Sequence, residues 1–452
     1  MNKQNYIEKV TEQIRCKRAL PLVTKELEDH IEDQKSDYMA EGMNATEAEE
    51  EAVRSMGDPI EVGVEMDRIH RPKMAWKMIG LIGLLNLTGL ILLYLLRMRI
   101  TGDMGNDPAE VEWIASGTGG NIDYIKYLLW MIAGFGCMIG ICYLDYSWIG
   151  KYAKILAGGW ILLTGIGEFA GAVYINGATY GIRFVAGIVL PLRPFLYLIV
   201  PVYGAILYSM RNKKEGYMGV IKAVLWQVVP VWLILRIPNL SMALSVEFTF
   251  LLLLSIAVWK DWFAVNKKRT LAVLWGIAAF LPVISIAVFA KLGILQGYQM
   301  RRIQALVHMN TDEADTFTGA LRKIIAGAHL VGQGDYKDFS FFNSDYMLTF
   351  LIHYYGILAA VLLILIIGSV LFWFLRKSRH QKNQLGMIMG IGCVAIIFIQ
   401  FICYILENLG FLPMGNNYCL FLTAGGSGML SGYLMMGILL SIYRYQNVVV
   451  AI

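Results

Sequence analysis

Long apolar runs recur along the chain from residue 76 to its end, separated by short polar and charged stretches. A helix needs about 20 consecutive apolar residues to cross the hydrocarbon core of a bilayer. Such runs predict membrane-spanning helices over residues 76–97, 124–144, 152–174, 184–209, 218–236, 240–259, 270–293, 346–375, 384–407 and 418–442. The pattern therefore indicates an all-α, polytopic membrane protein with about ten transmembrane helices.

The first 72 residues follow a different pattern, in which charged residues are frequent and apolar residues recur at helical spacing. Leu27, Ile31 and Tyr38 fall on one face of a predicted helix, and residues 57–59 (G-D-P) end a later one. This spacing predicts a small, cytosolic bundle of amphipathic helices. We therefore expect a prefix or regulatory domain over residues 1–72 and a transmembrane domain over residues 73–452.

The composition excludes an ordinary soluble protein. Hydrophobic residues make up 57% of the chain and charged residues 16%. The first residues lack the apolar segment of a cleavable signal peptide. The net charge of +5 comes from basic loops and is no argument for nucleic-acid binding. The six cysteines have no metal-ligand spacing, so the sequence predicts no metal site and no certain cofactor.

Lysine and arginine gather in alternate loops, near residues 73–77, 151–154, 211–214, 260–269 and 376–382. The positive-inside rule places these loops and both termini in the cytoplasm. The other loops then face outward, including the longest one over residues 294–345. A loop of this length is usually functional or disordered.

Three segments on the predicted outer side carry the most informative residues. The first is residues 176–183 (N-G-A-T-Y-G-I-R), which lead to Pro191 and Arg193. The second is the long loop, with residues 332–334 (G-Q-G) and 343–346 (N-S-D-Y). The third runs from Pro413 to residues 423–427 (T-A-G-G-S).

In order, spacing and placement these segments resemble the SEDS family of FtsW, RodA and SpoVE, over about residues 74–445. Residues 176–178 match the family's N-G-A, residues 344–346 match its T-D-F, and residues 425–427 match the end of its S-Y-G-G-S motif. The resemblance implies a bacterial plasma-membrane protein that polymerises glycan strands from lipid II, working with a class B penicillin-binding protein.

The chain departs from the family at informative positions. Gly181 stands where the family has a tryptophan, which removes an aromatic platform for a sugar or lipid. Arg193 stands where the family has a glutamate, and residues 353–354 (H-Y) replace an acidic pair. The sequence leaves two interpretations open: a diverged member with an altered substrate, or a member that has lost catalysis.

Asp345 occupies the position of the family carboxylate that is proposed to take the proton from the acceptor sugar hydroxyl. An aspartate beside aromatic residues at a membrane–water boundary is suited to such a role, because desolvation raises a carboxyl pKa. The alternative is that Ser344 or Asp345 simply caps the predicted helix over residues 346–375.

Four ionisable residues fall in the outer half of the predicted spans, where charges are usually paired or functional: Glu168, Arg193, Glu247 and Glu407. Arg183 and Arg193 would attract the diphosphate of a lipid-linked substrate, with Glu168 or Glu247 holding Arg193 in place. The alternative is a structural ion pair that fixes helix packing.

Gly425, Gly426 and Ser427 are further candidates for substrate binding, because they match the last family motif. The alternative for these small residues is close approach between helices. A requirement for a divalent cation is left open.

At the other end of the chain, residues 56–59 (M-G-D-P) and the helices before them resemble the prefix domains found ahead of some bacterial permeases. That resemblance implies a role in interaction or regulation.

The first functional hypothesis is therefore a peptidoglycan glycosyltransferase that acts on lipid II at the outer face, in cell shape, division or sporulation. Its expected partners are lipid II, a class B penicillin-binding protein and membrane lipids, with no nucleic acid. The second hypothesis is a catalytically inactive scaffold that binds a penicillin-binding protein. The third is a transporter of a lipid-linked precursor, which the scarcity of ionisable residues in the inner half of the spans makes the weakest.

Overall fold

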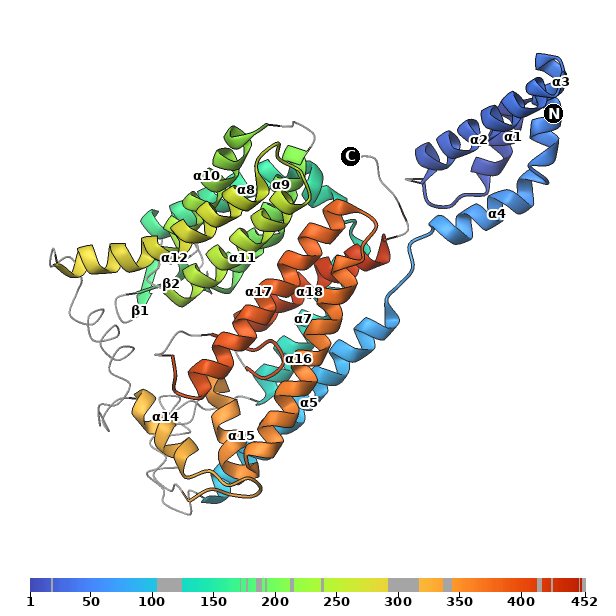
Figure 1. Ribbon diagram of the computed structural model, residues 1–452. Helices are drawn as coiled ribbons and strands as arrows, with labels where there is room; N and C mark the ends of the chain where they lie inside the picture. The colour runs from blue at the N-terminus through green and yellow to red at the C-terminus, as the bar shows by residue number, and fades with distance from the viewer. Residues whose placement is uncertain are drawn as a thin grey trace.

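The computed structural model covers residues 1–452 and describes all of them except 18, 104–123, 171, 176–177, 184–188, 192, 212–214, 237–239, 292–316, 336–343, 413–416, 424–425, 447 and 449–452. Figure 1 shows a helical bundle with a smaller group of N-terminal helices that extends from one end of it. We call this end of the bundle the proximal end and the opposite end the distal end.

The N-terminal group consists of α1 (Lys3–Glu12), α2 (Leu20–Ala40), α3 (Ala45–Ser55) and α4 (Pro59–His70). The side chains of Asn2, Asn44 and Asp58 cap α1, α3 and α4 by accepting hydrogen bonds from first-turn amides. The group has its own apolar core, which includes Tyr6, Val10, Val23, Leu27, Ile31 and Ala52. Its assignment as a separate cytosolic domain that ends at residue 72 stays a prediction.

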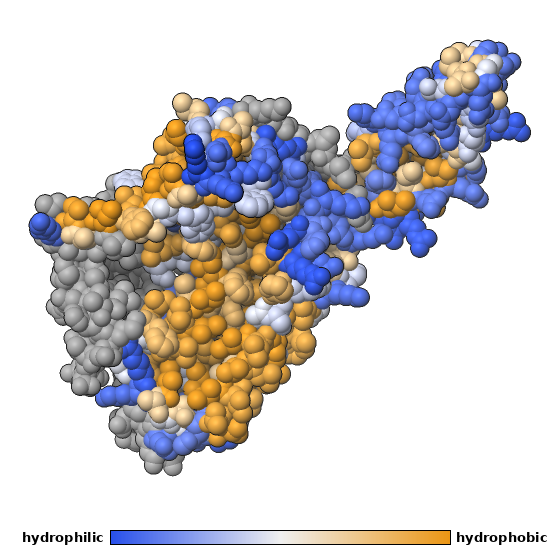
Figure 2. All heavy atoms as spheres, in the orientation of Figure 1, coloured by the Kyte–Doolittle hydropathy of each residue, from blue (hydrophilic) through white to orange (hydrophobic). Residues whose placement is uncertain are grey.

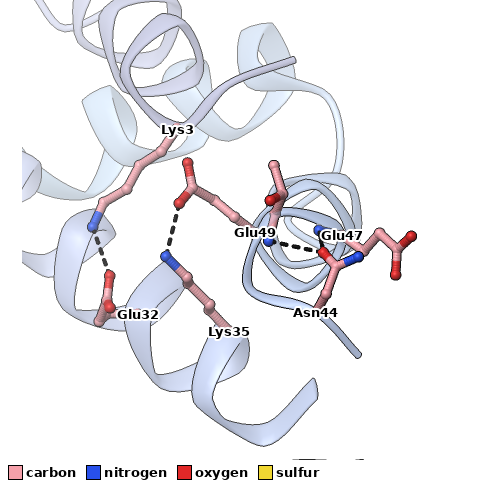
Figure 3. Close-up of polar contacts among 7 residues, drawn as sticks. Lys3, Glu32, Lys35, Asn44, Glu47 and Glu49 are labelled. Atoms are coloured by element: carbon pink, nitrogen blue, oxygen red, sulfur yellow. Dashed lines mark hydrogen bonds and ion pairs between the residues drawn. The ribbon is translucent and has the colours of Figure 1, made fainter. Parts of the chain in front are cut away.

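Polar contacts join α2 to α1 and to α3 (Figure 3). Lys3 Nζ lies 3.2 Å from Glu32 Oε2, and Lys35 Nζ lies 2.9 Å from Glu49 Oε2. The hydrogen bond from Lys35 lowers the pKa of the Glu49 carboxyl, and the same bond raises the pKa of Lys35. These partly exposed pairs add a small contribution to the packing of α1 and α3 on α2, which rests mainly on the apolar core.

Replacing Glu49 with glutamine is expected to remove a small, pH-dependent part of the stability of α2 and α3. Because folding lowers the pKa of Glu49, its contribution is fully present above the unfolded value of about 4.3 and is lost as the pH falls through the folded-state value. Hydrogen exchange in the full chain checks this: wild type should be better protected than Glu49→Gln at about pH 7, and the difference should be smaller at about pH 3. Equal protection at both pH values would contradict the pairing.

The bundle is built from apolar helices, most of them long, as predicted. They are α5 (Trp76–Asp103), α7 (Tyr124–Tyr143), α8 (Ser147–Ala170), α9 (Ile199–Met210), α10 (Tyr217–Arg236), α11 (Leu240–Trp259), α12 (Lys267–Lys291), α14 (Phe317–Ala326), α15 (Met347–Tyr355), α16 (Ile357–Arg379), α17 (Gln384–Asn408) and α18 (Gly426–Arg444). Among the described residues, α5, α10, α11, α16 and α17 are each long and apolar enough to span a membrane. The all-α, polytopic class is confirmed, and each predicted span overlaps a helix.

Two apolar cores meet along α17 and α18. One core gathers side chains of α5, α7, α15 and α16, and the other gathers those of α8 to α11. Hydrophobic residues also cover much of the outside of the bundle in Figure 2, whereas the N-terminal helices are mainly hydrophilic. Exposed apolar side chains of this kind, such as Leu365 and Phe372 of α16, are what a helix presents to lipid.

The α7–α8 connection lies at the proximal end, where the two helices meet at 110°. The connection is fixed to α18, because the amide of Tyr146 donates to Ser441 Oγ at 3.1 Å. Arg444, the last residue of α18, also donates to the Cys142 carbonyl at 3.3 Å. Its own carbonyl accepts from the amide of Lys73 at 3.1 Å, which holds the start of the bundle at the same end.

The region between α8 and α9 differs from the prediction. The predicted helices over 152–174 and 184–209 were too long, because residues 172–191 contain an antiparallel sheet of β1 (Ala172–Ile175), β2 (Ala178–Arg183) and β3 (Val189–Pro191). A 3₁₀ helix, η1 (Arg193–Leu198), then leads into α9. The segment is rich in β-branched and aromatic residues, which favour strands. Pro191 and Pro194 also lack the amide that a continuous helix would need.

Candidate functional site

The predicted helix over residues 346–375 is broken in two. α15 ends at Tyr355, Gly356 adopts φ 92° and ψ 168°, and α16 starts at Ile357. In Figure 1 the two helices lie side by side and meet at the distal end of the bundle. Because α15 has nine residues, it is about 14 Å long. Asp345 therefore lies at the start of a short returning helix, at the end of α15 farther from the distal end of the bundle.

The glycine-containing loop before this helix closes the break. The amide of Gly334 donates to the His353 carbonyl at 2.8 Å, and the amide of Ile357 donates to the His329 carbonyl at 3.0 Å. The amide of Leu358 likewise bonds the Leu330 carbonyl at 3.1 Å. These bonds satisfy backbone groups that the helix break exposes. The predicted G-Q-G motif thus belongs to the structure that holds α15 against α16.

The first turn of α15 takes its hydrogen-bond partners from α17. Tyr346 at the N-cap position makes no capping bond with its side chain. The amide of Leu348 donates to Tyr404 Oη at 3.3 Å, and the amide of Thr349 donates to Asn408 Oδ1 at 3.1 Å. Whether Ser344 or Asp345 also caps the helix stays an open alternative.

A second carboxylate, Glu407, lies buried beside Asp345, with 4% of its surface exposed. Its Oε1 accepts from Tyr346 Oη at 3.2 Å, and its Oε2 accepts from the Asn417 amide at 3.2 Å and from Asn417 Nδ2 at 2.9 Å. Asn417 Oδ1 accepts in turn from Ser241 Oγ at 3.0 Å. A buried charge needs such donors to offset its lost hydration. Glu407 therefore fixes the ends of α11, α15 and α17 relative to one another.

Replacing Glu407 with alanine is expected to lower the free energy of unfolding by about 2 kcal/mol, because the Asn417 and Tyr346 donors lose their acceptor. Replacement with glutamine should cost much less, since the Tyr346 hydroxyl can accept from the new amide while the remaining oxygen serves Asn417. Thermal unfolding of the purified chain in detergent measures both. Equal losses in the two variants would contradict the hydrogen-bond assignment.

The segment before α18 is also non-helical inside the bundle. The predicted span 418–442 starts too early, because α18 begins only at Gly426. Phe421, buried in this segment, lies with its carbonyl oxygen against Gly89 in the middle of α5. The segment also lines a small cavity with the buried side chain of Gln400 of α17. Non-helical backbone at this depth is tolerated only inside a protein or beside a polar cavity.

The predicted binding residues are only partly placed. Glu168 lies in α8, Arg183 in β2 and Arg193 in η1, and their side chains fall outside the described part of the structure. Glu247 lies half-buried in α11. The predicted pairing of Arg193 with Glu168 or Glu247 therefore stays a prediction.

The predicted glycine and serine positions lie at the start of α18. Gly425 falls outside the described residues, Gly426 begins α18, and Ser427 lies in its first turn with its side chain outside the described part. Within the described ranges, no group of three His, Cys, Asp or Glu side chains is arranged to hold a metal ion. The need for a divalent cation stays an open question.

Sequence reasoning identified Asp345 and Glu407 but missed the side chains that hold them. Asn408 and Tyr404 bond the turn that follows Asp345, and Asn417 bonds Glu407. A weak signal was present in the sequence. The polar residues Glu407 and Asn408 stand at the end of a long apolar run, within four residues of Tyr404. Such polar residues inside a membrane helix usually face the protein interior.

These features define a class: a polytopic helical membrane protein with a buried polar cluster at the start of a short returning helix. A family model described as "Cell cycle protein", for FtsW, RodA and SpoVE, matches residues 76–448. The chain belongs to this family.

One curated relative and several solved structures are similar to this chain. Stage V sporulation protein E of Bacillus subtilis (strain 168) is 22% identical over 176 residues, which is 37% of this chain and 48% of that protein. The match thus spans about half the length of that curated relative. A structure described as "Structural coordination of polymerization and crosslinking by a peptidoglycan synthase complex" is similar with a TM-score of 0.63 and 17% identity, over 82% of this chain and 98% of the other. The rod shape determining protein RodA of Thermus thermophilus has a TM-score of 0.54 and 15% identity, over 82% and 97% of the two chains.

Proposed function

We propose that this protein is a peptidoglycan glycosyltransferase, or a diverged form of one, that uses lipid II in cell-wall synthesis. Membership of the family supports this proposal, and so does the likeness to a chain of a peptidoglycan synthase complex. The observation that carries it is the placement of Asp345. Its backbone carbonyl accepts from Asn408 of α17, the Thr349 amide in the next turn bonds the same side chain, and the Asp345 side chain is partly exposed.

In the proposed reaction the Asp345 carboxylate accepts the proton of the acceptor sugar hydroxyl. The hydroxyl oxygen forms a bond to the anomeric carbon of the donor sugar. The bond between that carbon and the undecaprenyl diphosphate breaks, and the diphosphate leaves with the electron pair. A positioned general base contributes about 10²- to 10⁴-fold to such a proton transfer.

The diphosphate is the group that the basic residues are proposed to hold. Arg183 is the last residue of β2, and Arg193 is the first residue of η1. Arginine pairs well with phosphate oxygens. In this proposal Glu168 or Glu247 orients Arg193, and the start of α18 around Gly426 faces the substrate.

We further propose that the proximal end faces the cytoplasm and the distal end faces outward. Basic residues support this orientation, because Lys77, Lys151, Lys267 and Arg376 belong to helix ends on the proximal side. In this orientation Asp345 and the α15–α16 break lie in the outer half of the membrane. The N-terminal helices would lie inside the cell, where they could dock a regulatory partner.

A second candidate is a scaffold that binds a class B penicillin-binding protein without turning over substrate. The observation that favours it is the sequence itself, since Gly181 and Arg193 replace the family's tryptophan and glutamate. The test is incubation of the purified full chain with labelled lipid II, alone and with candidate penicillin-binding proteins. Glycan polymer is the expected product. A complex without polymer under every condition would favour the scaffold, and lipid II movement across vesicles without polymer would favour the transporter.

A further inference from the structure

Asn408, the last residue of α17, makes several hydrogen bonds with the segment that begins at Asp345. It is fully buried, as is Thr349 in the first turn of α15. Its Nδ2 donates to the Asp345 carbonyl at 3.2 Å, and its Oδ1 accepts from the Thr349 amide at 3.1 Å. One side chain therefore bonds both ends of the segment from Asp345 to Thr349.

The backbone of Asn408 adds a further bond to the same segment. Thr349 Oγ1 donates to the Asn408 carbonyl at 2.7 Å and also lies 3.3 Å from its Oδ1. Asn408 Nδ2 donates as well to the Tyr404 carbonyl, one turn back in α17, at 2.9 Å. The amide plane of Asn408 is thus fixed by its own helix, and this orientation determines where the Asp345 carbonyl can lie.

These bonds join a long helix to a short one. α17 is a 25-residue span that packs against α9, α11, α16 and α18, whereas α15 has nine residues. α15 is buried from Met347 to Tyr354, so packing sets its general position, while the hydrogen bonds from Asn408 set the turn at its start. A mobile side chain on it would be poorly placed for catalysis, because a displacement of about 1 Å can cost roughly 100-fold in rate.

We propose that Asn408 is a positioning residue that sets the backbone of Asp345 through its carbonyl, and so sets the direction in which the Asp345 carboxylate points. Asn408 does not touch substrate in this proposal. The inference rests on the proposed function in so far as Asp345 is the base. The placement of residue 345 is a physical property that is measurable without turnover.

The kinetic test compares Asn408→Ala with Asn86→Ala in polymerisation of labelled lipid II by the full chain. Asn86 of α5 is a matched control because its side-chain amide is also buried, and its hydrogen bonds go to Tyr433 and the Ile82 carbonyl. Asn408→Ala is expected to lower kcat by roughly tenfold to 100-fold with KM changed by less than about threefold. Asn86→Ala should lose similar thermal stability and keep kcat within about twofold. A kcat loss that follows thermal stability equally in both variants would overturn the proposal.

A second measurement is independent of turnover. The thiol of an Asp345→Cys variant is labelled with a maleimide, with and without Asn408→Ala, and labelling is read peptide by peptide. Loss of Asn408 should change the labelling rate at position 345 by about fivefold or more, while a Leu330→Cys control in the neighbouring loop stays within about twofold. Unchanged labelling at 345 overturns the positioning role. Changed labelling at 345, together with a wild-type chain that makes no polymer under any partner condition, leaves the positioning intact and rejects the glycosyltransferase proposal.

Discussion

Replacing Asp345 with asparagine is expected to lower the rate of glycan polymerisation by about 10²- to 10⁴-fold, the contribution of a positioned general base. The substitution keeps the size and shape of the side chain but removes its ability to accept a proton. Because α15 is capped by Tyr404 and Asn408, the variant should fold with an unchanged thermal midpoint. The measurement is the initial rate of polymer formation from labelled lipid II.

Asp335 supplies the matched control for this variant. It lies in the loop at the distal end, where its exposed carboxylate is 3.2 Å from His329. Asp335→Asn removes a carboxylate close in sequence and should leave the rate within about twofold, since exposed pairs of this kind contribute little. Polymerisation that survives in Asp345→Asn at the wild-type rate would remove the base from the mechanism.

Replacing Gly356 with alanine is expected to destabilise the chain by about 4 kcal/mol. Its φ of 92° and ψ of 168° belong to a region that only glycine adopts readily. A Cβ atom at this position would also lie 2.6 Å from the Leu330 carbonyl oxygen and 2.7 Å from Val331 Cα. Both neighbours are backbone atoms of the loop that closes the break, so they cannot yield by a rotamer change.

Gly368 is the control for this second prediction. It lies inside α16, where an added Cβ would meet nothing within 4 Å. Gly368→Ala should therefore be neutral or raise stability by up to about 1 kcal/mol, because alanine favours helix. Thermal unfolding and proteolysis of the loop around residues 327–335 distinguish the two variants. An equal and small effect of both substitutions would mean that α15 and α16 do not require the break at Gly356.

The breaks in the fold were the part that the sequence could not predict. Residues 346–375 form one apolar run, and an isolated glycine inside such a run is also common in continuous helices. Hydrophobicity reports that a segment is buried or lipid-facing, and it reports nothing about whether the segment turns back. The sheet over residues 172–191 was missed for a related reason, since an apolar strand and a short apolar helix have the same composition.

The candidate site divides in the same way. Asp345 was identified because a motif marked its position, and Glu407 because a carboxylate inside a span is unusual. The residues that hold them act over long sequence separations: Asn408 bonds Thr349 59 positions away. Such pairings depend on how α15 folds back against α17, and single-sequence periodicity contains no information about that contact.

The most direct test of the central claim is the pH dependence of polymerisation for wild type and Asp345→Asn under identical conditions. If Asp345 is the base, the wild-type kcat/KM should fall about tenfold per pH unit on the acidic side as the carboxylate becomes protonated. The residual rate of Asp345→Asn should have no such acidic limb. An acidic limb of the same slope and position in both proteins would show that another group accepts the proton, and would contradict the account.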